Sequence, residues 1–272
     1  MRKLFSQPTQ IIGLIILFSI AAMVILGPLF VTHDPAATDF SSKLKPPTET
    51  HWLGTDQFGR DVLARVLEGG RRSLGAALLV VAGVMIISVF LGLTAALSGG
   101  VIDQLITRTI DIILALPSLV FALAIVGILG PGFGNLVLAM VISHWASNTR
   151  LVRSFVLTAR NRPDIIASWE AGMSWPQIIF GHILPEVMSK LIIVLTLRLG
   201  DIIVSISGLS FLGLGVQPPA AEWGAMLSQA RLFFEYAPWL LLAPASAIFL
   251  TVIGANMVGE GIQELIDPTL KQ

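Results

Sequence analysis

The feature that most constrains this chain is a long stretch without any charge. Between Asp111 and Arg150 there is no Asp, Glu, Lys or Arg. A helix needs about 20 largely apolar residues to cross the hydrocarbon core of a bilayer, because each residue rises only ~1.5 Å. The stretch is too long for one span, and the segment from Gly130 to Asn135 interrupts it with three glycines and a proline. It therefore predicts a hairpin of two membrane-spanning helices.

Four other stretches are also apolar and long enough to cross a membrane: 11–31, 74–97, 191–216 and 236–258. The chain is 54% hydrophobic and only 12% charged, about half the charge of an average soluble domain. We predict an all-α, polytopic membrane protein with six transmembrane helices. The first stretch has no small-x-small cleavage site after it, so we expect it to stay in place as a span rather than act as a signal peptide.

The positive charges that flank the predicted spans indicate their orientation. Arg2 and Lys3 precede the first span, and the connection 151–190 between the fourth and fifth spans carries further basic residues. We therefore expect residues 1–10, the connection 151–190 and residues 259–272 in the cytoplasm, and the segment 32–73 on the other side. The segment 32–73 is also rich in basic residues, but acidic residues match them.

Composition excludes several kinds of chemistry. The formal net charge is zero, which gives no field that would attract nucleic acid, and the absence of cysteine excludes disulfides and thiolate ligands. The sequence contains no Gly-Lys pair, so it lacks the phosphate-binding P-loop, and we expect no enzyme activity. No metal site is predicted, because the histidines are scattered without ligand-like spacing: His33, His51, His144 and His182.

A transporter of this kind must draw its energy from an ion gradient or from a separate ATPase. An ion-coupled secondary transporter usually carries carboxylates or broken helices within its spans. A subunit driven by an ATPase needs a cytoplasmic segment on which the ATPase can act, and the connection 151–190 is a candidate for this segment. Its middle, 164–181, is predicted to form a short helix with exposed apolar residues, which could equally lie on the membrane surface. A simple membrane anchor is a third alternative.

The connection 151–190 resembles the cytoplasmic loop of permease subunits in binding-protein-dependent ABC importers. The family pattern is Glu-Ala-Ala-x-x-x-Gly, followed later by a hydrophobic residue, Leu and Pro; Gly172 and residues 183–185 match it, whereas residues 166–168 read Ile-Ala-Ser where Glu-Ala-Ala would stand. In that family the loop forms a coupling helix that docks on the ATPase. The residues that the resemblance assigns to ATPase coupling are Ile166, Ala167, Ser168, Glu170, Gly172, Leu184 and Pro185.

Further segments resemble the second, C-type permease of dipeptide, oligopeptide and nickel importers. Residues 54–61 read G-T-D-Q-F-G-R-D, which matches the pattern G-T-D-x-x-G-R-D that follows the first span in those subunits, and residues 71–74 continue that block. Residues 210–219 and the Glu-Trp-Gly of residues 222–224 match the family at the end of the fifth span. These segments occur in the order and with the spacing of the family, and together the resemblance covers nearly the whole chain.

The resemblance implies an ABC importer type I permease fold in the cytoplasmic (inner) membrane, with residues 74–258 as the permease core. It implies four partners besides the lipid bilayer: a homologous second permease, two ATPase subunits and an extracytoplasmic solute-binding protein. ATP and Mg would bind to the partner subunits, and this chain would carry no cofactor. The residues placed toward the binding protein, where they either dock it or pack the outer surface, are Asp56, Arg60, Asp61, Glu222 and Trp223.

The fifth predicted span carries two charges, which normally face protein or water because an ion in lipid costs a few kcal/mol. Arg198, Asp201, Ser205 and Gly208 share one helical face, which we expect to line the translocation pathway. Alternatively, the two charges neutralise each other or bridge to the partner permease. The charges, with Ser143-His144-Trp145-Ala146, resemble the nickel branch and favour a nickel or metal-chelate (metallophore) cargo over a peptide. With so few strong ligands, the metal would cross in chelated form.

Overall fold

The computed structural model describes residues 8–266, so the outermost parts of the predicted cytoplasmic ends, 1–7 and 267–272, lie outside it. The prediction of an all-α chain is confirmed, since the described part pairs strand-like backbone only at an isolated bridge between Thr55 and Asp61. The α-helices are α1 (Pro8–Phe30), α2 (Val62–Ser98), α3 (Gly100–Leu114), α4 (Ser118–Leu129), α5 (Phe133–Arg160), α6 (Pro163–Glu170), α7 (Trp175–Ile178), α8 (Leu184–Leu197), α9 (Leu199–Phe211), α10 (Trp223–Ala230) and α11 (Trp239–Ile266). A 3₁₀ turn, η1 (Phe40–Ser42), and a π-helical turn, η2 (Ile179–Ile183), complete the described elements.

By length and apolar character, four helical stretches of the described chain can cross a membrane: α1, α2, the continuous stretch Trp175–Leu197, and Trp239–Gly261 within α11. A fifth candidate is the pair of α3 and α4, which is bent by 90°. The predicted fourth span lies within α5, whose 28 residues are long enough but include polar side chains in its second half. The number six therefore remains a prediction.

The bent third span departs from the prediction for a local reason. Pro117 has no N–H to donate, and its ring disfavours helical backbone at Leu116, so the helix that begins at Gly100 ends at Leu114. A new helix, α4, begins at Ser118 with Pro117 as its N-cap residue. The apolar stretch after Asp111 is thus divided between the end of α3 and the whole of α4.

The second and fifth spans also have different bounds from those predicted. The helix of the second span begins at Val62 instead of Leu74, because the side chain of Asp61 caps it by accepting a hydrogen bond from the backbone N–H of Ala64 at 2.7 Å. The fifth predicted span, 191–216, is divided between α8 and α9, with Arg198 at the break, and α9 ends at Phe211.

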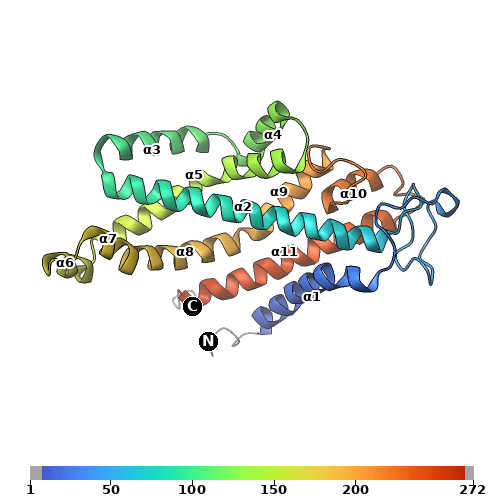
Figure 1. The fold of residues 1–272 in the computed structure, drawn as a ribbon, viewed down its shortest axis with the longest axis horizontal. Coiled ribbons are helices and arrows are strands. Elements are labelled where there is room, and N and C mark those ends of the chain that lie inside the picture. Colours follow the sequence, from blue (N-terminus) through green and yellow to red (C-terminus); the bar gives the residue numbers. More distant parts are fainter. Residues whose placement is uncertain (1–7, 267–272) are drawn as a thin grey trace.

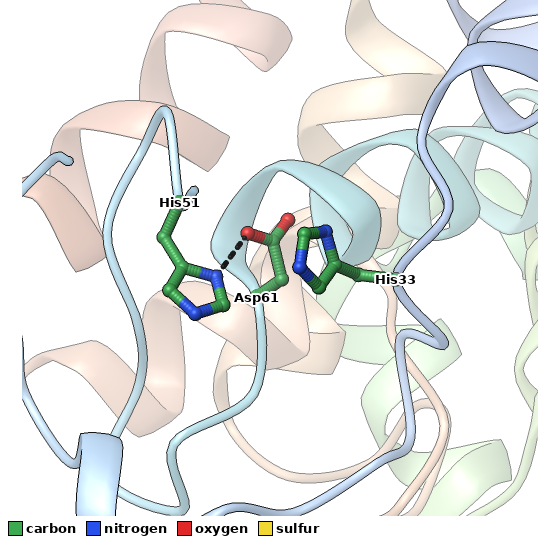
Figure 2. A group of neighbouring side chains, drawn as sticks. All are labelled: His33, His51 and Asp61. Atoms are coloured by element: carbon green, nitrogen blue, oxygen red, sulfur yellow. Dashed lines mark hydrogen bonds and ion pairs between the residues drawn. The ribbon is translucent and has the colours of Figure 1, made fainter. Parts of the chain in front are cut away.

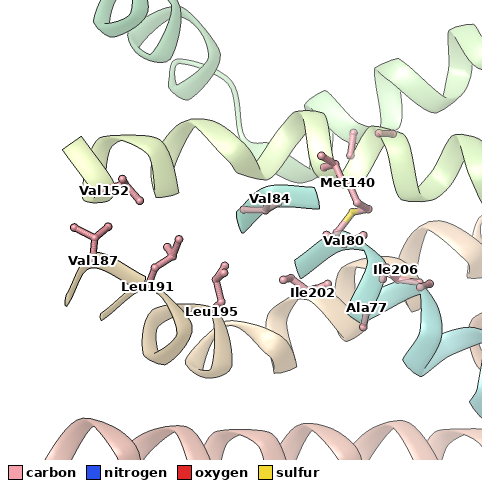
Figure 3. Close-up of a cluster of buried hydrophobic side chains, with 14 of the residues drawn as sticks. Ala77, Val80, Val84, Met140, Val152, Val187, Leu191, Leu195, Ile202 and Ile206 are labelled. Carbon is pink, nitrogen blue, oxygen red and sulfur yellow. The ribbon is translucent and has the colours of Figure 1, made fainter. Parts of the chain in front are cut away.

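The hydrophobic core lies where α2 and α5 run alongside each other and pack on α8 and α9. Figure 3 shows side chains from these four helices meeting in one cluster; the labelled ones are Ala77, Val80, Val84, Met140, Val152, Val187, Leu191, Leu195, Ile202 and Ile206. All are at most 2% exposed. Helix α1 packs mainly on α11 at the edge of the bundle (Figure 1).

The two ends of the helical bundle carry different structures. Figure 1 shows the long connection between α1 and α2 at one end, and α6 protruding at the opposite end. The beginning of α1 and the end of α11 point toward the same end as α6. The segments expected to contact the binding protein and the ATPase are therefore separated by the length of the bundle.

Candidate translocation pocket and partner-facing segments

A pocket of about 510 Å³ lies where the bend between α3 and α4 faces α5 and α9. The bend contributes mainly apolar side chains, whereas α5 and α9 contribute most of the polar ones. The polar lining residues are Ser118, Ser143, His144, Ser147, Arg198, Asp201 and Ser205. A volume of this size is typical of sites for small organic ligands, which occupy ~300–1,000 Å³.

Arg198 occupies the break between α8 and α9 and reaches across the pocket wall. Its Nη1 donates a hydrogen bond to Ser147 Oγ on α5 at 3.0 Å. Within residues 8–266, no ion pair of 4 Å or less joins Arg198 to Asp201, so the two charges do not neutralise each other directly. Asp201 is exposed and Ser205 half-buried. The pocket therefore presents a cationic and an anionic group separately.

The pocket brings together three of the four residues predicted for the fifth span. Arg198, Asp201 and Ser205 line it, but Gly208, further along α9, does not. The predicted face included no lining residue from α5. The sequence could have indicated the lining residues of α5, which are Ser143, His144 and Ser147. Their spacing of i, i+1 and i+4 places polar groups on one side of an otherwise apolar helix.

His144 is held in place within its own helix. Its Nδ1 lies 2.9 Å from both Ser143 Oγ and the carbonyl oxygen of Met140. The imidazole is half-buried and lines the pocket next to the side chains of α9. It is the pocket's only imidazole among the described residues, and it can act as a hydrogen-bonding group or as one ligand to a metal.

Ion pairs fasten α3 to α5 on this side of the molecule. Arg153 makes a two-pronged contact with Asp103, with Nε to Oδ1 and Nη2 to Oδ2 both at 2.6 Å. Arg150 Nη2 lies 2.5 Å from Asp111 Oδ1. Because α3 continues into the bend that forms one wall of the pocket, these contacts help to fix the position of that wall relative to α5.

The charged residues of the turn before α2 stabilise the turn itself. Asp56 Oδ1 accepts hydrogen bonds from the backbone N–H groups of Phe58 at 2.8 Å and Arg60 at 3.0 Å, and its Oδ2 pairs with Arg60 Nε at 2.6 Å. Asp61 caps α2 through Ala64. Asp56, Arg60 and Asp61 are all 5% exposed or less, so their burial favours the packing alternative over direct docking of the binding protein.

Glu222 and Trp223 are likewise buried at 1% exposure. The Glu222 side chain caps α10 by accepting a hydrogen bond from the backbone N–H of Ala225 at 3.0 Å, and it accepts another from Ser73 Oγ on α2 at 2.9 Å. Trp223 Nε1 donates to the carbonyl oxygen of Val66 at 2.8 Å. These two residues join α10 to α2, which again favours packing over docking.

The expected coupling segment is two short helices instead of the single helix predicted over 164–181. Helix α6 carries Ile166, Ala167, Ser168 and Glu170, a turn follows at Gly172, and α7 begins at Trp175. Leu184 and Pro185 belong to α8 and are separated from α6 by α7 and η2. Ile166 and Trp169 are exposed by 44% and 55%, but Ile165 and Ile178, also expected to be exposed, are buried.

Arg162 joins the start of α6 to α8. Its Nε and Nη2 donate to Asp164 at 3.0 and 2.7 Å, and its Nη1 contacts Glu186. The hydrogen bonds from Arg162 hold the pKa of Asp164 below its ordinary value, and the same contacts raise the pKa of Arg162. The carboxylate of Asp164 is therefore protonated only at a lower pH than an aspartate without such a partner.

Two family models match the chain. Residues 88–272 match the family described as binding-protein-dependent transport system inner membrane component. Residues 1–47 match the N-terminal transmembrane domain of oligopeptide transport permease C.

Individual relatives agree with these families along nearly the whole chain. A dipeptide transport system permease protein of Alkalihalophilus pseudofirmus is 42% identical over 99% of this chain and 89% of its own length. A nickel transport system permease protein of Escherichia coli K12 is 35% identical over 95% of this chain and 94% of its own length. An oligopeptide transport system permease protein of Bacillus subtilis is 34% identical over 100% of this chain and 89% of its own length.

These matches confirm the class of transporter inferred from the residues 54–61 and 166–185. They imply an inner-membrane subunit that works with ATPase and binding-protein partners, is not itself catalytic and carries no cofactor. The nickel branch is not singled out, because peptide and nickel permeases both align over 95% or more of the chain. The chain belongs to the permease subunits of binding-protein-dependent ABC importers, and within them to the oligopeptide-permease-C type of the peptide and nickel branch.

Proposed function

We propose that this chain forms half of the translocation pathway for a di- or oligopeptide, with the pocket between α3–α4, α5 and α9 as its contribution to that pathway. The observation that carries the proposal is the separate placement of Arg198 and Asp201 on the pocket wall. A peptide at neutral pH carries a carboxylate at one end and an ammonium group at the other. The guanidinium of Arg198 suits the first and the carboxylate of Asp201 suits the second.

The volume of the pocket also suits a peptide better than a bare ion. Its ~510 Å³ leaves room for a small organic molecule, and its walls are partly apolar through Ile113, Leu114 and Leu116. Apolar walls do not select among cargo side chains by hydrogen bonding, so we expect side chains of different sizes to pass. The peptide relatives named above support this cargo for the present chain.

A nickel or other metal-chelate cargo is the second candidate, and His144 is the observation that favours it. An imidazole in the pocket could bind an open position of a chelated nickel ion, and one of the relatives is a nickel permease. The chain has no cysteine, so the pocket offers no thiolate and the ion would have to arrive with most of its ligands already in place.

The proposed direction of transport rests on which end of the bundle faces the ATPase subunits and which end faces the binding protein. We place α6 in the cytoplasm, where exposed Ile166 and Trp169 would contact an ATPase subunit, and the connection between α1 and α2 outside. Trp52 and Phe58 on that connection are exposed by 71% and 40%, and they offer contact area to the binding protein that the buried Asp56 and Arg60 cannot.

Reconstituted transport separates the two cargoes. The complete complex, with its second permease, ATPases and binding protein, is placed in proteoliposomes, and ATP-dependent uptake of a labelled dipeptide is measured with and without excess histidine-chelated nickel. We expect saturable dipeptide uptake that the chelate does not reduce. Uptake of the chelate with no uptake of any peptide in a panel of di- and tripeptides would establish the second candidate instead.

The role of the pocket is tested by Arg198→Ala, with Arg108→Ala on α3, outside the pocket lining, as the matched control. Loss of a charge-assisted contact worth ~1.5–3 kcal/mol predicts at least a tenfold lower uptake for Arg198→Ala. Assembly with the partner subunits, measured by co-purification, should be unchanged. If Arg198→Ala prevents assembly, the side chain serves the structure instead of the cargo.

A further inference from the structure

A second group of polar side chains lies far from the translocation pocket, where α1 ends and α2 begins. His33 follows α1, His51 lies in the connection, and Asp61 is the N-cap residue of α2. Figure 2 shows the three side chains turned toward one another. One potential ligand atom from each residue lies within 4.8 Å of the other two. The fold thus brings together two histidines that are 18 positions apart in the sequence, a spacing that is not typical of metal-binding motifs.

We propose that His33, His51 and Asp61 form a binding site for a divalent transition-metal ion on the extracytoplasmic side of the chain. The ligand set of two imidazoles and one carboxylate is typical of zinc sites that keep a further position for water. Imidazole ligands favour Zn²⁺, Ni²⁺ or Co²⁺ over Mg²⁺ and Ca²⁺, which prefer oxygen ligands. This site is independent of the cargo that the translocation pocket accepts.

The distances suit an ion after a small adjustment. His51 Nδ1 lies 2.9 Å from Asp61 Oδ2, close to the ~3.3 Å that separates two ligand atoms sharing a tetrahedral ion at ~2.0 Å from each. The rings of His33 and His51 have centroids 4.9 Å apart and an angle of 43° between their planes. His33 is exposed, so rotation of its side chain can bring a ring nitrogen to the ion without disturbing the packing.

Asp61 can take part without giving up its structural role. Its Oδ1 accepts the capping hydrogen bond from Ala64, and its Oδ2 faces His51. Ligation through Oδ2 therefore leaves the cap of α2 intact. The carboxylate is 4% exposed and His51 is 18% exposed in their side chains, so two of the ligands are already held in position by the surrounding structure.

There is also room for the ion and its water. A pocket of about 270 Å³ opens beside this group; its lining includes His33, Asp61, Glu49 and Trp52, and His51 adjoins it through its contact with Asp61. A bound ion would link the end of α1, the connection and the start of α2. The expected consequence is a more rigid outer segment next to the surface that we assign to the binding protein.

The site is tested on the full-length chain purified in detergent. Titration calorimetry with Zn²⁺ should detect one saturable site per chain. Visible spectra with Co²⁺ should show the intense absorption bands that are typical of a Co²⁺ ion with a low coordination number. His33→Ala should lower the affinity for the ion at least ~100-fold. Replacing a residue that only hydrogen-bonds to a metal ligand already lowers the affinity about 10–100-fold, and His33 would be a ligand itself. Asp61→Asn, which keeps a side chain able to cap α2, should also weaken binding.

The matched control is His182→Ala, which removes an exposed histidine from η2 at the other end of the bundle and should leave binding unchanged. Folding of each variant is checked by circular dichroism and size-exclusion chromatography. The proposal is overturned if the unaltered chain shows no saturable binding, or if His33→Ala binds Zn²⁺ as tightly as the unaltered chain. Binding that survives His33→Ala but disappears in His144→Gln would place the ion in the translocation pocket and would also overturn it.

Discussion

Single residues of the turn before α2 show how a charged motif can be structural. Gly59 has a φ of +75°, and a Cβ on it would lie 1.7 Å from the carbonyl oxygen of Asp39. The backbone of residues 39 and 58 is joined there by a hydrogen bond of 3.1 Å from Asp39 N to Phe58 O. The motif therefore needs glycine at this position both for its backbone angle and for the close approach of a second chain segment.

We expect Gly59→Ala to destabilise the chain, because the left-handed backbone costs ~1–2 kcal/mol with a Cβ and the clash adds to this. The matched control is Gly75→Ala, since a Cβ at Gly75 in α2 meets nothing within 4 Å and alanine favours helix by ~1 kcal/mol over glycine. Thermal unfolding in detergent should show a lower midpoint for Gly59→Ala only. Equal midpoints for the two variants would contradict the packing seen at Asp39.

At the scale of the elements, α6 differs from the candidate membrane-spanning helices because it is short and protrudes from the end of the bundle (Figure 1). Arg162 ties its first turn to α8 through Asp164 and Glu186. A force applied to α6 would thus be passed to α8, and from α8 to the break at Arg198 beside the pocket. If the ATPase docks on α6 as proposed, this connection would give it a route to the pocket.

Replacing Ile166 by Ser should weaken docking of the ATPase. Burial of an isoleucine side chain contributes ~1.5–3 kcal/mol, so its loss predicts an affinity about 10–100-fold lower. The measurement is binding of the purified ATPase to the permease pair, together with ATP-dependent uptake. Ile15→Ser is the control, because Ile15 is also exposed, at 59%, but belongs to α1 instead of the coupling segment. Unchanged ATPase affinity in Ile166→Ser would remove α6 from the docking surface.

At the scale of the whole molecule, we expect the energy for transport to come from partner subunits. The sequence lacks a P-loop, and the family to which it belongs works with separate ATPase subunits. Transport must therefore depend on the assembled complex.

Expression of this chain without its partners should give no uptake of a labelled dipeptide, whereas co-expression of the complete set should restore it. A protonophore should leave uptake into ATP-loaded proteoliposomes unchanged, while removal of ATP should abolish it. Uptake by the chain alone, or its collapse with the protonophore, would show an ion-coupled carrier.

The relatives do not single out the nickel cargo that the sequence favoured. Arg198, Asp201 and the segment around His144 favoured nickel, but peptide permeases align with the chain as fully as the nickel permease does. Charged groups in a pocket can serve a zwitterion as readily as a chelate. Their presence in the sequence therefore indicates a polar pathway without choosing between the two.

The class of protein could be predicted from the sequence, because long apolar stretches cannot be solvated and must form helices in a membrane, and because motifs such as residues 54–61 follow one another in the order known from the family. The sequence also determined which span holds the unusual charges. The positions of the side chains follow from the folded chain, which separates Arg198 from Asp201, buries Asp56 and Glu222 in packing contacts, and brings His33 to His51 and Asp61. These arrangements depend on contacts between distant segments, which spacing along the chain does not encode.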